Sequence, residues 1–219
     1  MHQQLIFKFP FKTTYDEKDF FVSSNNFEVY KLIESWPNWP NKSINIFGPK
    51  GSGKTHLIKI LKKRIKIIDY SMKKIENLDS SKIDNSECVV IDNFNEQINE
   101  KKLYSFLNHI NQLDKFLILS SRVPLKQKKI KLVDLQSRIN SFLNVGIDLP
   151  TDDLLRVIIV KYFSDKQIKI DLKILEYMIK NVERSYEHVF EILKKIDEHS
   201  LSLGHSITIK MVKKFLKNE

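Results

Sequence analysis

The sequence has little cysteine, glycine or arginine: its 219 residues include one cysteine, five glycines and five arginines. The single cysteine, Cys88, excludes an internal disulfide and suits a reducing cytoplasm, so we expect a small buried side chain rather than a reactive thiol. The longest apolar runs, 88–91 and 157–160, are far shorter than the ~20 residues of a membrane span. Lys8 and Pro10 interrupt any signal-peptide core. The six histidines lack both cysteine partners and a His-Glu-x-x-His pattern, so no zinc site is expected.

The net charge of +10 comes from an excess of lysine. Such an excess favours nucleic acid as a partner, and an anionic membrane second. Codon bias in an AT-rich genome would also enrich lysine, so compositional drift is the alternative to a binding surface. Residues 1–149 hold 24 basic and 16 acidic side chains, a net charge of +8, and residues 150–219 hold 13 and 11. Any basic surface is therefore expected mainly before residue 150.

Apolar runs alternate with helical patterns up to residue 149, and helical patterns alone follow. The expected strands are 43–47, 65–70, 87–91, 116–120 and 145–149. The expected helices are 26–36, 54–63, 101–113 and 132–142, and then 152–163, 172–181, 185–203 and 208–217. This order predicts an α/β domain, with a parallel five-stranded sheet between helices, followed by a small all-helical domain. The expected caps of the last four helices are Thr151, Asp171, Ser185 and Thr208.

Residues 48–55 fit the phosphate-loop pattern G-x-x-x-x-G-K-[ST] at every fixed position. They follow an expected strand and open an expected helix, which is the context that the motif requires. Glycines let successive backbone N–H groups turn toward a phosphate, and the helix N-terminus adds partial positive charge. Lys54 is expected to reach the β- and γ-phosphates, and Thr55 to hold Mg²⁺. The expected nucleotide-binding residues here are Gly48, Pro49, Lys50, Gly51, Ser52, Gly53, Lys54, Thr55 and His56.

A second metal ligand is expected from Asp92, which ends the apolar run 88–91. Taken alone, Asp92 could instead cap a strand end. Asn93 follows it, in a position that is usually acidic in ring-forming P-loop ATPases. Because an asparagine cannot accept a proton from water, we expect the protein's own ATP hydrolysis to be weak.

Two further residues could act on phosphates. Ser121 follows the expected strand 116–120 and is expected beside the phosphates, where it could sense the γ-phosphate; a solvated loop serine is the alternative. Arg138 lies near the end of a helix just before the last strand, from which an arginine can reach into a neighbour's nucleotide. An arginine inserted in this way contributes ~10³–10⁵ in rate. Without that context, a surface salt bridge would explain Arg138.

With these residues, the chain resembles the Hda family of DnaA-related AAA+ proteins over nearly its whole length. The similarity is carried by residues 19–26 and 36–40, by the Leu-Gln-Ser-Arg box at 135–138, and by 183–185 and 207–208. It implies an AAA+ P-loop NTPase with an N-terminal extension (1–18), an α/β nucleotide-binding domain (19–149) and a helical lid domain (150–219). It further implies bound ADP or ATP with Mg²⁺. The implied function is regulatory inactivation of the replication initiator DnaA, with Arg138 as an arginine finger acting in trans on DnaA-bound ATP.

The resemblance also implies roles for residues outside the phosphate loop. The lid residue that senses nucleotide aligns with His188, and Arg184 lies one turn earlier, so either could contact phosphate. Residues 4–9 are similar to the segment that binds the DNA polymerase sliding clamp, although Phe7 and Phe9 replace commoner leucines. Without the resemblance, this segment would be a disordered tail or an edge strand. The expected clamp-binding residues are Gln4, Leu5, Ile6, Phe7 and Phe9.

The implied partners are DnaA and the sliding clamp, with DNA contacted indirectly through the clamp and a homo-oligomer left open. No membrane partner is expected, and the implied location is the cytoplasm, with nucleoid association during replication. Two other functions fit the sequence. One is a DNA-binding AAA+ ATPase, a helicase loader or truncated initiator, which the net charge and the lysines of segment 126–131 favour. The other is a non-catalytic adaptor tethered to the clamp.

Overall fold

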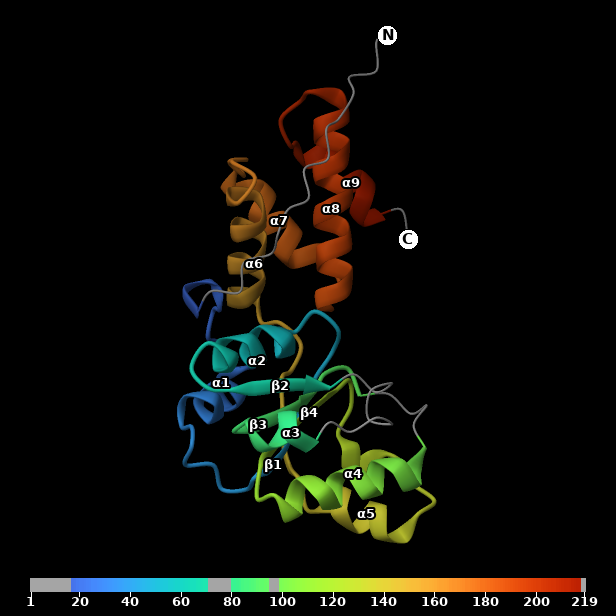
Figure 1. Cartoon of the computed structure of the whole chain (residues 1–219). Coiled ribbons are helices and arrows are strands. Elements are labelled where there is room, and N and C mark those ends of the chain that lie inside the picture. The colour runs from blue at the N-terminus through green and yellow to red at the C-terminus, as the bar shows by residue number, and fades with distance from the viewer. Residues whose placement is uncertain (1–16, 71–79, 95–98, 218–219) are drawn as a thin grey trace. The chain divides into compact units, whose positions relative to one another are not determined.

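The computed structural model describes residues 17–70, 80–94 and 99–217 of the chain (Figure 1). It divides after Asp148 into two compact units, and Leu149 begins the second. Each unit has a hydrophobic core of its own. Residues 1–16, which include the predicted clamp-binding segment, lie outside the described residues.

The first unit is built on a sheet of parallel strands in the order β2-β3-β4-β1-β5. The strands are β1 (Ser43–Phe47), β2 (Ile67–Tyr70), β3 (Cys88–Ile91), β4 (Phe116–Ser121) and β5 (Leu143–Gly146). The predicted α/β fold with a parallel five-stranded sheet is confirmed. Because β1 lies between β4 and β5, the carboxyl end of β1, where the phosphate loop begins, lies inside the sheet rather than at its rim.

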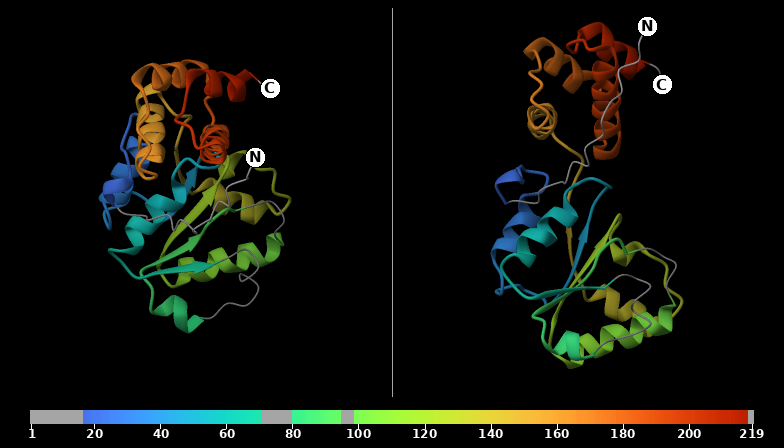
Figure 2. Two further views of the ribbon diagram at one scale, coloured as in Figure 1. Left: turned by 90° about the horizontal axis from the view of Figure 1, so that it is seen from above. Right: turned by 45° about the horizontal axis from the view of Figure 1, so that its top comes forward.

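Helices cover both faces of this sheet, with α1 and α2 on one side and α4 and α5 on the other (Figures 1 and 2). Side chains alternate along each strand: Val89 and Ile91 enter the core beneath α4 and α5, while Cys88 and Val90 enter the core beneath α1 and α2. A strand buried on both faces must be apolar throughout, which explains the unbroken run 88–91. The helices of this unit are η1 (Glu17–Asp19), α1 (Phe27–Glu34), α2 (Lys54–Lys62), α3 (Ser80–Asp84), α4 (Glu100–Gln112), η3 (Leu125–Gln127) and α5 (Val133–Asn140).

The last strand differs from the prediction of 145–149, because β5 begins two residues earlier and ends at Gly146. Helix α5 ends at Asn140 rather than 142, which leaves Leu143 free to pair with Ile44 of β1. The Ile147 N–H still donates to the carbonyl of Phe47 in β1 at 2.8 Å, but the next N–H, of Asp148, donates to the Asn25 carbonyl at 3.0 Å. The polar turn at Asn25 thus ends the strand, although the apolar pattern continues to residue 149.

The second unit consists of four helices, α6 (Asp152–Ser164), α7 (Leu172–Asn181), α8 (Tyr186–Leu203) and α9 (Ile209–Lys217), in its described part. Apolar side chains from all four form one core. The four predicted caps are confirmed, because each side-chain oxygen accepts a hydrogen bond from a backbone N–H in the first turn of its helix. These oxygens belong to Thr151, Asp171, Ser185 and Thr208.

A partly buried ion pair joins α8 to the loop that follows α6. Asp197 of α8 is 3% exposed and bonds the ammonium of Lys166, which follows α6 and is about a third exposed. We expect Lys166→Met to lower the free energy of unfolding by about 3–5 kcal/mol, because it leaves a buried carboxylate unpaired. Asp197→Asn should cost less, since water can solvate Lys166. Urea denaturation of both variants tests this order, with Lys161→Met at the exposed Lys161–Asp165 pair as a control costing about 1 kcal/mol or less.

Candidate functional site

The phosphate loop connects β1 to α2, and its glycines have backbone angles that other residues rarely adopt. Gly51 has φ 83°, and Gly53, which is the N-cap of α2, has φ 96°. A Cβ atom on Gly48 would lie 2.7 Å from the carbonyl oxygen of Ile147. The motif therefore needs glycine at Gly51 and Gly53 for a left-handed backbone, and at Gly48 for the close approach of Ile147, which follows β5.

Lys54 lies at the first position of α2 and is buried against its own loop. Its ammonium donates to the carbonyl oxygen of Gly48 at 2.7 Å and to that of Pro49 at 2.8 Å. Burial lowers the pKa of the Lys54 ammonium; the charge of Asp92 opposes this shift and that of Arg122 adds to it. A buried cation held by neutral carbonyl groups is well suited to bind a phosphate, which would supply the missing negative charge.

Asp92 directly follows β3 and meets the phosphate loop across the sheet. The Thr55 hydroxyl donates to Asp92 Oδ2 at 2.8 Å, although the two residues are 37 positions apart in the sequence. The carboxyl ends of parallel strands meet at one edge, which explains this approach. The predicted metal ligands Thr55 and Asp92 are thus in contact with each other.

Thr55 and Asp92 could hold a magnesium ion only together with phosphate oxygens. Among the described residues, no group of three or more His, Cys, Asp and Glu side chains gathers as a metal site. Mg²⁺ is typically bound by one or two protein oxygens, substrate phosphates and water, so this pair fits a nucleotide-borne metal. When bound, the ion would neutralise charge on the β- and γ-phosphates.

Ser120, rather than Ser121, lies beside Asp92. The Ser120 hydroxyl donates to Asp92 Oδ1 and accepts the N–H of Asn93 at 2.9 Å. Ser121 is 1% exposed; its hydroxyl accepts from the Asn45 amide at 2.8 Å and donates to the carbonyl oxygen of Val123 at 2.7 Å. We predicted Ser121 beside the phosphates; the serine that contacts the predicted metal ligand Asp92 is its neighbour Ser120, because side chains alternate along β4.

Asn93 occupies the position next to the metal ligand in a left-handed conformation, with φ 57°. Its N–H donates to Asp92 Oδ1 at 3.0 Å as well as to Ser120. Asparagine tolerates this conformation better than most residues. The backbone of Asn93 therefore helps to fix the Asp92 carboxylate, while its side chain offers no base.

Phe20, a residue without a role in the sequence analysis beyond the family resemblance, packs against the phosphate loop. A Cβ atom on Gly53 would lie 3.0 Å from the Phe20 ring. The ring also contacts His56 edge-on, with centroids 5.4 Å apart, and stacks on Tyr30 of α1 at 6.0 Å. Its aromatic character alone gives no indication of this position, because the contact joins residues far apart in the sequence.

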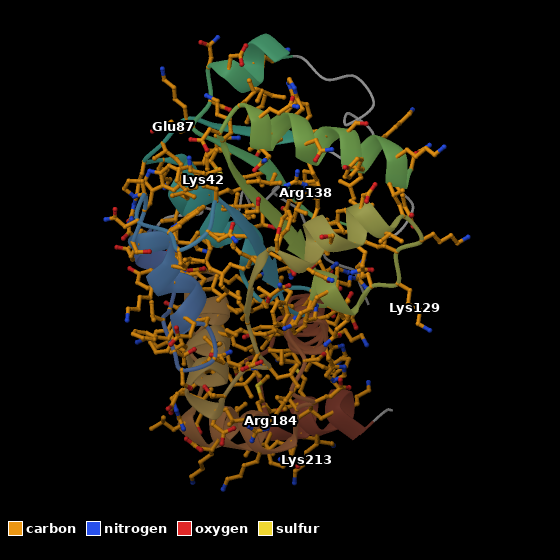
Figure 3. All side chains as sticks on the ribbon, turned by 90° about the horizontal axis from the view of Figure 1, so that it is seen from below. Lys42, Glu87, Lys129, Arg138, Arg184 and Lys213 are labelled. Carbon is orange, nitrogen blue, oxygen red and sulfur yellow. The ribbon has the colours of Figure 1, made fainter. Side chains whose placement is uncertain are left out.

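Arg138 lies on α5 with its side chain exposed (Figure 3). Its Nε donates to Asn108 Oδ1 of α4 at 3.1 Å, and no carboxylate bonds it among the described residues. The salt bridge that we considered as the alternative is therefore not observed in this part of the chain. The amide of Asn108 orients the guanidinium without neutralising its charge.

The two lid candidates lie at the start of α8 and make contacts within the lid. The Arg184 guanidinium pairs with Asp152 of α6 at 2.7 Å. The backbone N–H of His188 donates to the Ser185 hydroxyl at 3.1 Å as part of the cap.

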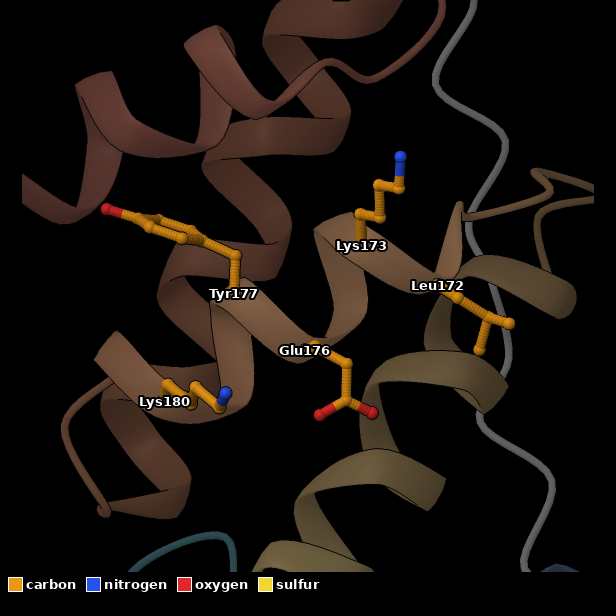
Figure 4. A pocket seen from close by; sticks show the side chains of 5 residues that line it. All are labelled: Leu172, Lys173, Glu176, Tyr177 and Lys180. Atoms are coloured by element: carbon orange, nitrogen blue, oxygen red, sulfur yellow. The ribbon is translucent and has the colours of Figure 1, made fainter.

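A separate hollow lies on α7, and none of the predicted nucleotide-binding residues lines it (Figure 4). Its lining residues are Leu172, Lys173, Glu176, Tyr177 and Lys180.

Comparisons with known proteins show which proteins this fold and this lid resemble. Residues 156–216 match the family model of the Hda lid domain. An uncharacterized protein of Haemophilus influenzae is 26% identical over 185 residues, which cover 78% of this chain and 80% of that protein. Domain III of the replication initiation protein DnaA of Thermotoga maritima has a TM-score of 0.74 at 17% identity, covering 96% of this chain and 98% of that one.

Two further solved structures share the fold. AMPPCP-bound DnaA of Aquifex aeolicus has a TM-score of 0.65 at 20% identity, covering 84% of this chain and 65% of that one. The RuvB Holliday junction branch migration motor of Thermotoga maritima has a TM-score of 0.64 at 18% identity, covering 88% of this chain and 67% of that one.

No helix in the described ranges is long and apolar enough to cross a membrane.

The parallel sheet, the phosphate loop and the helical lid define an AAA+ P-loop NTPase fold. Residues 156–216 thus resemble the lid domain of Hda, and the chain shares its fold with domain III of DnaA.

Proposed function

We propose that this protein inactivates DnaA by stimulating hydrolysis of DnaA-bound ATP while it is itself bound to nucleotide and to the sliding clamp. The observation that carries the proposal is the Hda lid domain at residues 156–216, joined to a DnaA-like AAA+ fold. Clamp left on DNA behind the polymerase captures the protein through residues 4–9. Docking on ATP-bound DnaA then leaves ADP-bound DnaA, so that initiation does not repeat.

The chain's own nucleotide would have a structural role in this function. ADP or ATP would bind residues 48–56 with Lys54 at its phosphates, and Thr55 and Asp92 would hold Mg²⁺, which would neutralise phosphate charge. Asn93 supplies no base for the attacking water, so the bound nucleotide persists. Arg184 or His188 would then sense it from the lid. Ser121, the residue we predicted at the γ-phosphate, has its hydroxyl bonded to Asn45 and Val123.

Arg138 would act on the nucleotide of DnaA rather than on the chain's own. Its exposed side chain is bonded by the neutral amide of Asn108, which leaves its positive charge for an anionic partner. An arginine finger stabilises the charge that develops on the γ-phosphate as its bond to the leaving oxygen breaks. The composite site takes ATP, metal and water from DnaA and the guanidinium from Arg138.

One assay separates this function from the alternatives. DnaA-bound ATP is incubated with the protein, with and without clamp loaded on DNA, and ADP formation is followed. Stimulation that requires loaded clamp supports the proposal. An adaptor would bind clamp and DnaA without accelerating hydrolysis, and a helicase loader or truncated initiator would neither need the clamp nor stimulate DnaA.

The clamp contact can be tested separately by changing Gln4 and Leu5 together. We expect Gln4→Ala with Leu5→Ala to weaken clamp binding by about 30-fold or more, because a few anchors dominate peptide recognition. Surface plasmon resonance on immobilised clamp measures the effect. The adjacent His2→Ala with Gln3→Ala variant should bind as the unchanged protein does, and equal binding by both double variants would point to a different contact.

A further inference from the structure

More than half of the net charge of the protein lies on two segments of the first unit. Residues 99–113 and 122–140 together carry eight basic and two acidic side chains, a net charge of +6 out of +10. The described residues Lys101, Lys126, Lys129 and Lys131 are exposed, and we call these four the lysine surface. In Figure 3, Lys129 extends outward from the loop that leads into α5.

Hydrogen bonds tie the two segments of the lysine surface together. The Glu100 carboxylate, at the start of α4, accepts the N–H of Lys131 at 3.1 Å and that of Leu132 at 2.8 Å. The Asn99 side chain caps α4 by accepting the N–H of Lys101 at 3.1 Å. The loop before α5 is therefore fixed to the first turn of α4, which brings Lys131 of one segment close to Lys101 of the other.

The loop that carries Lys126 and Lys129 is anchored from beneath as well. Leu125 is fully buried, and its N–H donates to Asn45 Oδ1 of β1 at 3.0 Å. The Lys128 ammonium lies 5.0 Å from the centre of the Phe94 ring. A backbone held at both ends presents its charges without a large ordering cost on binding.

The acidic residues of these segments leave the positive charge largely uncompensated. Glu100 is engaged by two backbone N–H groups, and Asp134 lies in the first turn of α5, where the helix dipole favours a negative charge. Within the described residues, none of the four members of the lysine surface forms an ion pair or side-chain hydrogen bond. The face therefore attracts a polyanion.

We propose that the lysine surface binds the phosphate backbone of double-stranded DNA directly. Lysine is depleted at protein–protein interfaces, whereas phosphate contacts by lysine dominate nonspecific DNA binding. Single-stranded nucleic acid usually stacks on exposed aromatic rings, but Phe94, the aromatic ring at this loop, is buried. Lysine ammonium groups on a fixed loop can contact the regularly spaced phosphates of a duplex, and such contacts do not depend on the base sequence.

Salt-dependent DNA binding by the full protein alone tests the proposal, without DnaA or clamp, so its failure is separate from failure of the proposed function. A fluorescent duplex of arbitrary sequence is titrated between about 50 and 200 mM salt. We expect Lys126→Gln with Lys129→Gln and Lys131→Gln to reduce the slope of log K against log salt by about 3, or about 1 for each lost phosphate contact.

The matched control removes the same charge from exposed lysines of the lid, through Lys169→Gln with Lys194→Gln and Lys195→Gln. An unchanged slope for this control, with the reduced slope for the other variant, supports the proposal. Equal slopes for the two variants overturn it, as does tighter binding to a single strand of the same sequence. If the unchanged protein did not bind the duplex and the variant instead lost affinity for DnaA, the lysine surface would be a binding site for an acidic protein. That result would also overturn the proposal.

Discussion

Replacing Arg138 by alanine is expected to reduce the clamp-dependent stimulation of DnaA ATP hydrolysis by about 10³-fold or more. Such a loss corresponds to about 4 kcal/mol of transition-state stabilisation. The side chain is exposed and bonded to the neutral Asn108, so its removal should leave the fold intact. Single-turnover hydrolysis of radiolabelled ATP on DnaA measures the effect.

Two further variants make the Arg138 result specific. Arg138→Lys keeps the charge but loses the planar fork, and it should restore little of the rate. Arg156→Ala removes an exposed arginine that pairs with Glu176 in the lid, and it should stimulate hydrolysis as the unchanged protein does. Full stimulation by Arg138→Ala with normal clamp binding would show that another group completes the DnaA site.

Replacing Lys54 by alanine is expected to weaken ADP and ATP binding by about 100-fold or more, because a buried, charge-assisted bond to the phosphates is lost. The nucleotide-free protein should not be less stable, since burial already lowers the pKa of this ammonium and penalises its charge. Titration with a fluorescent nucleotide gives the affinity. Thermal unfolding should show that added ADP no longer raises the Tm.

The control for Lys54 lies at the other end of the same helix. Lys63 is the exposed C-cap of α2, and Lys63→Ala should bind nucleotide as the unchanged protein does. If Lys54→Ala retained full affinity and the ligand-dependent rise in Tm, the interpretation of residues 48–55 as a phosphate loop would be wrong.

Much of the fold could be predicted from the sequence because local patterns reflect burial. The run 88–91 is apolar at every position, which only a strand covered on both faces requires, and it is β3 at the centre of the two cores. The lid helices were predicted from their apolar spacing and their caps. The end of β5 was wrong by three residues, because a hydrogen bond from Asp148 to the distant Asn25 ends the strand.

The candidate site could be predicted in its residue types but only partly in its geometry. Residues 48–55 are contiguous, so their loop shape follows from glycine and lysine spacing. Ser120 and Ser121 are neighbours in the sequence, and only the direction of β4 decides that Ser120 faces Asp92. The expected roles of the loop, of Arg138 and of the lid residues remain predictions until the variants are measured.

The sequence by itself determined that a phosphate loop lies between a strand and a helix and that helices alone follow residue 150. These features depend on residues close together along the chain, where backbone conformation and periodic burial act. Only the tertiary structure decided that Thr55 contacts Asp92, that Asn108 bonds Arg138, and that Glu100 connects the two segments that carry the lysine surface. Such contacts depend on strand order and helix packing, which join residues that no local pattern relates.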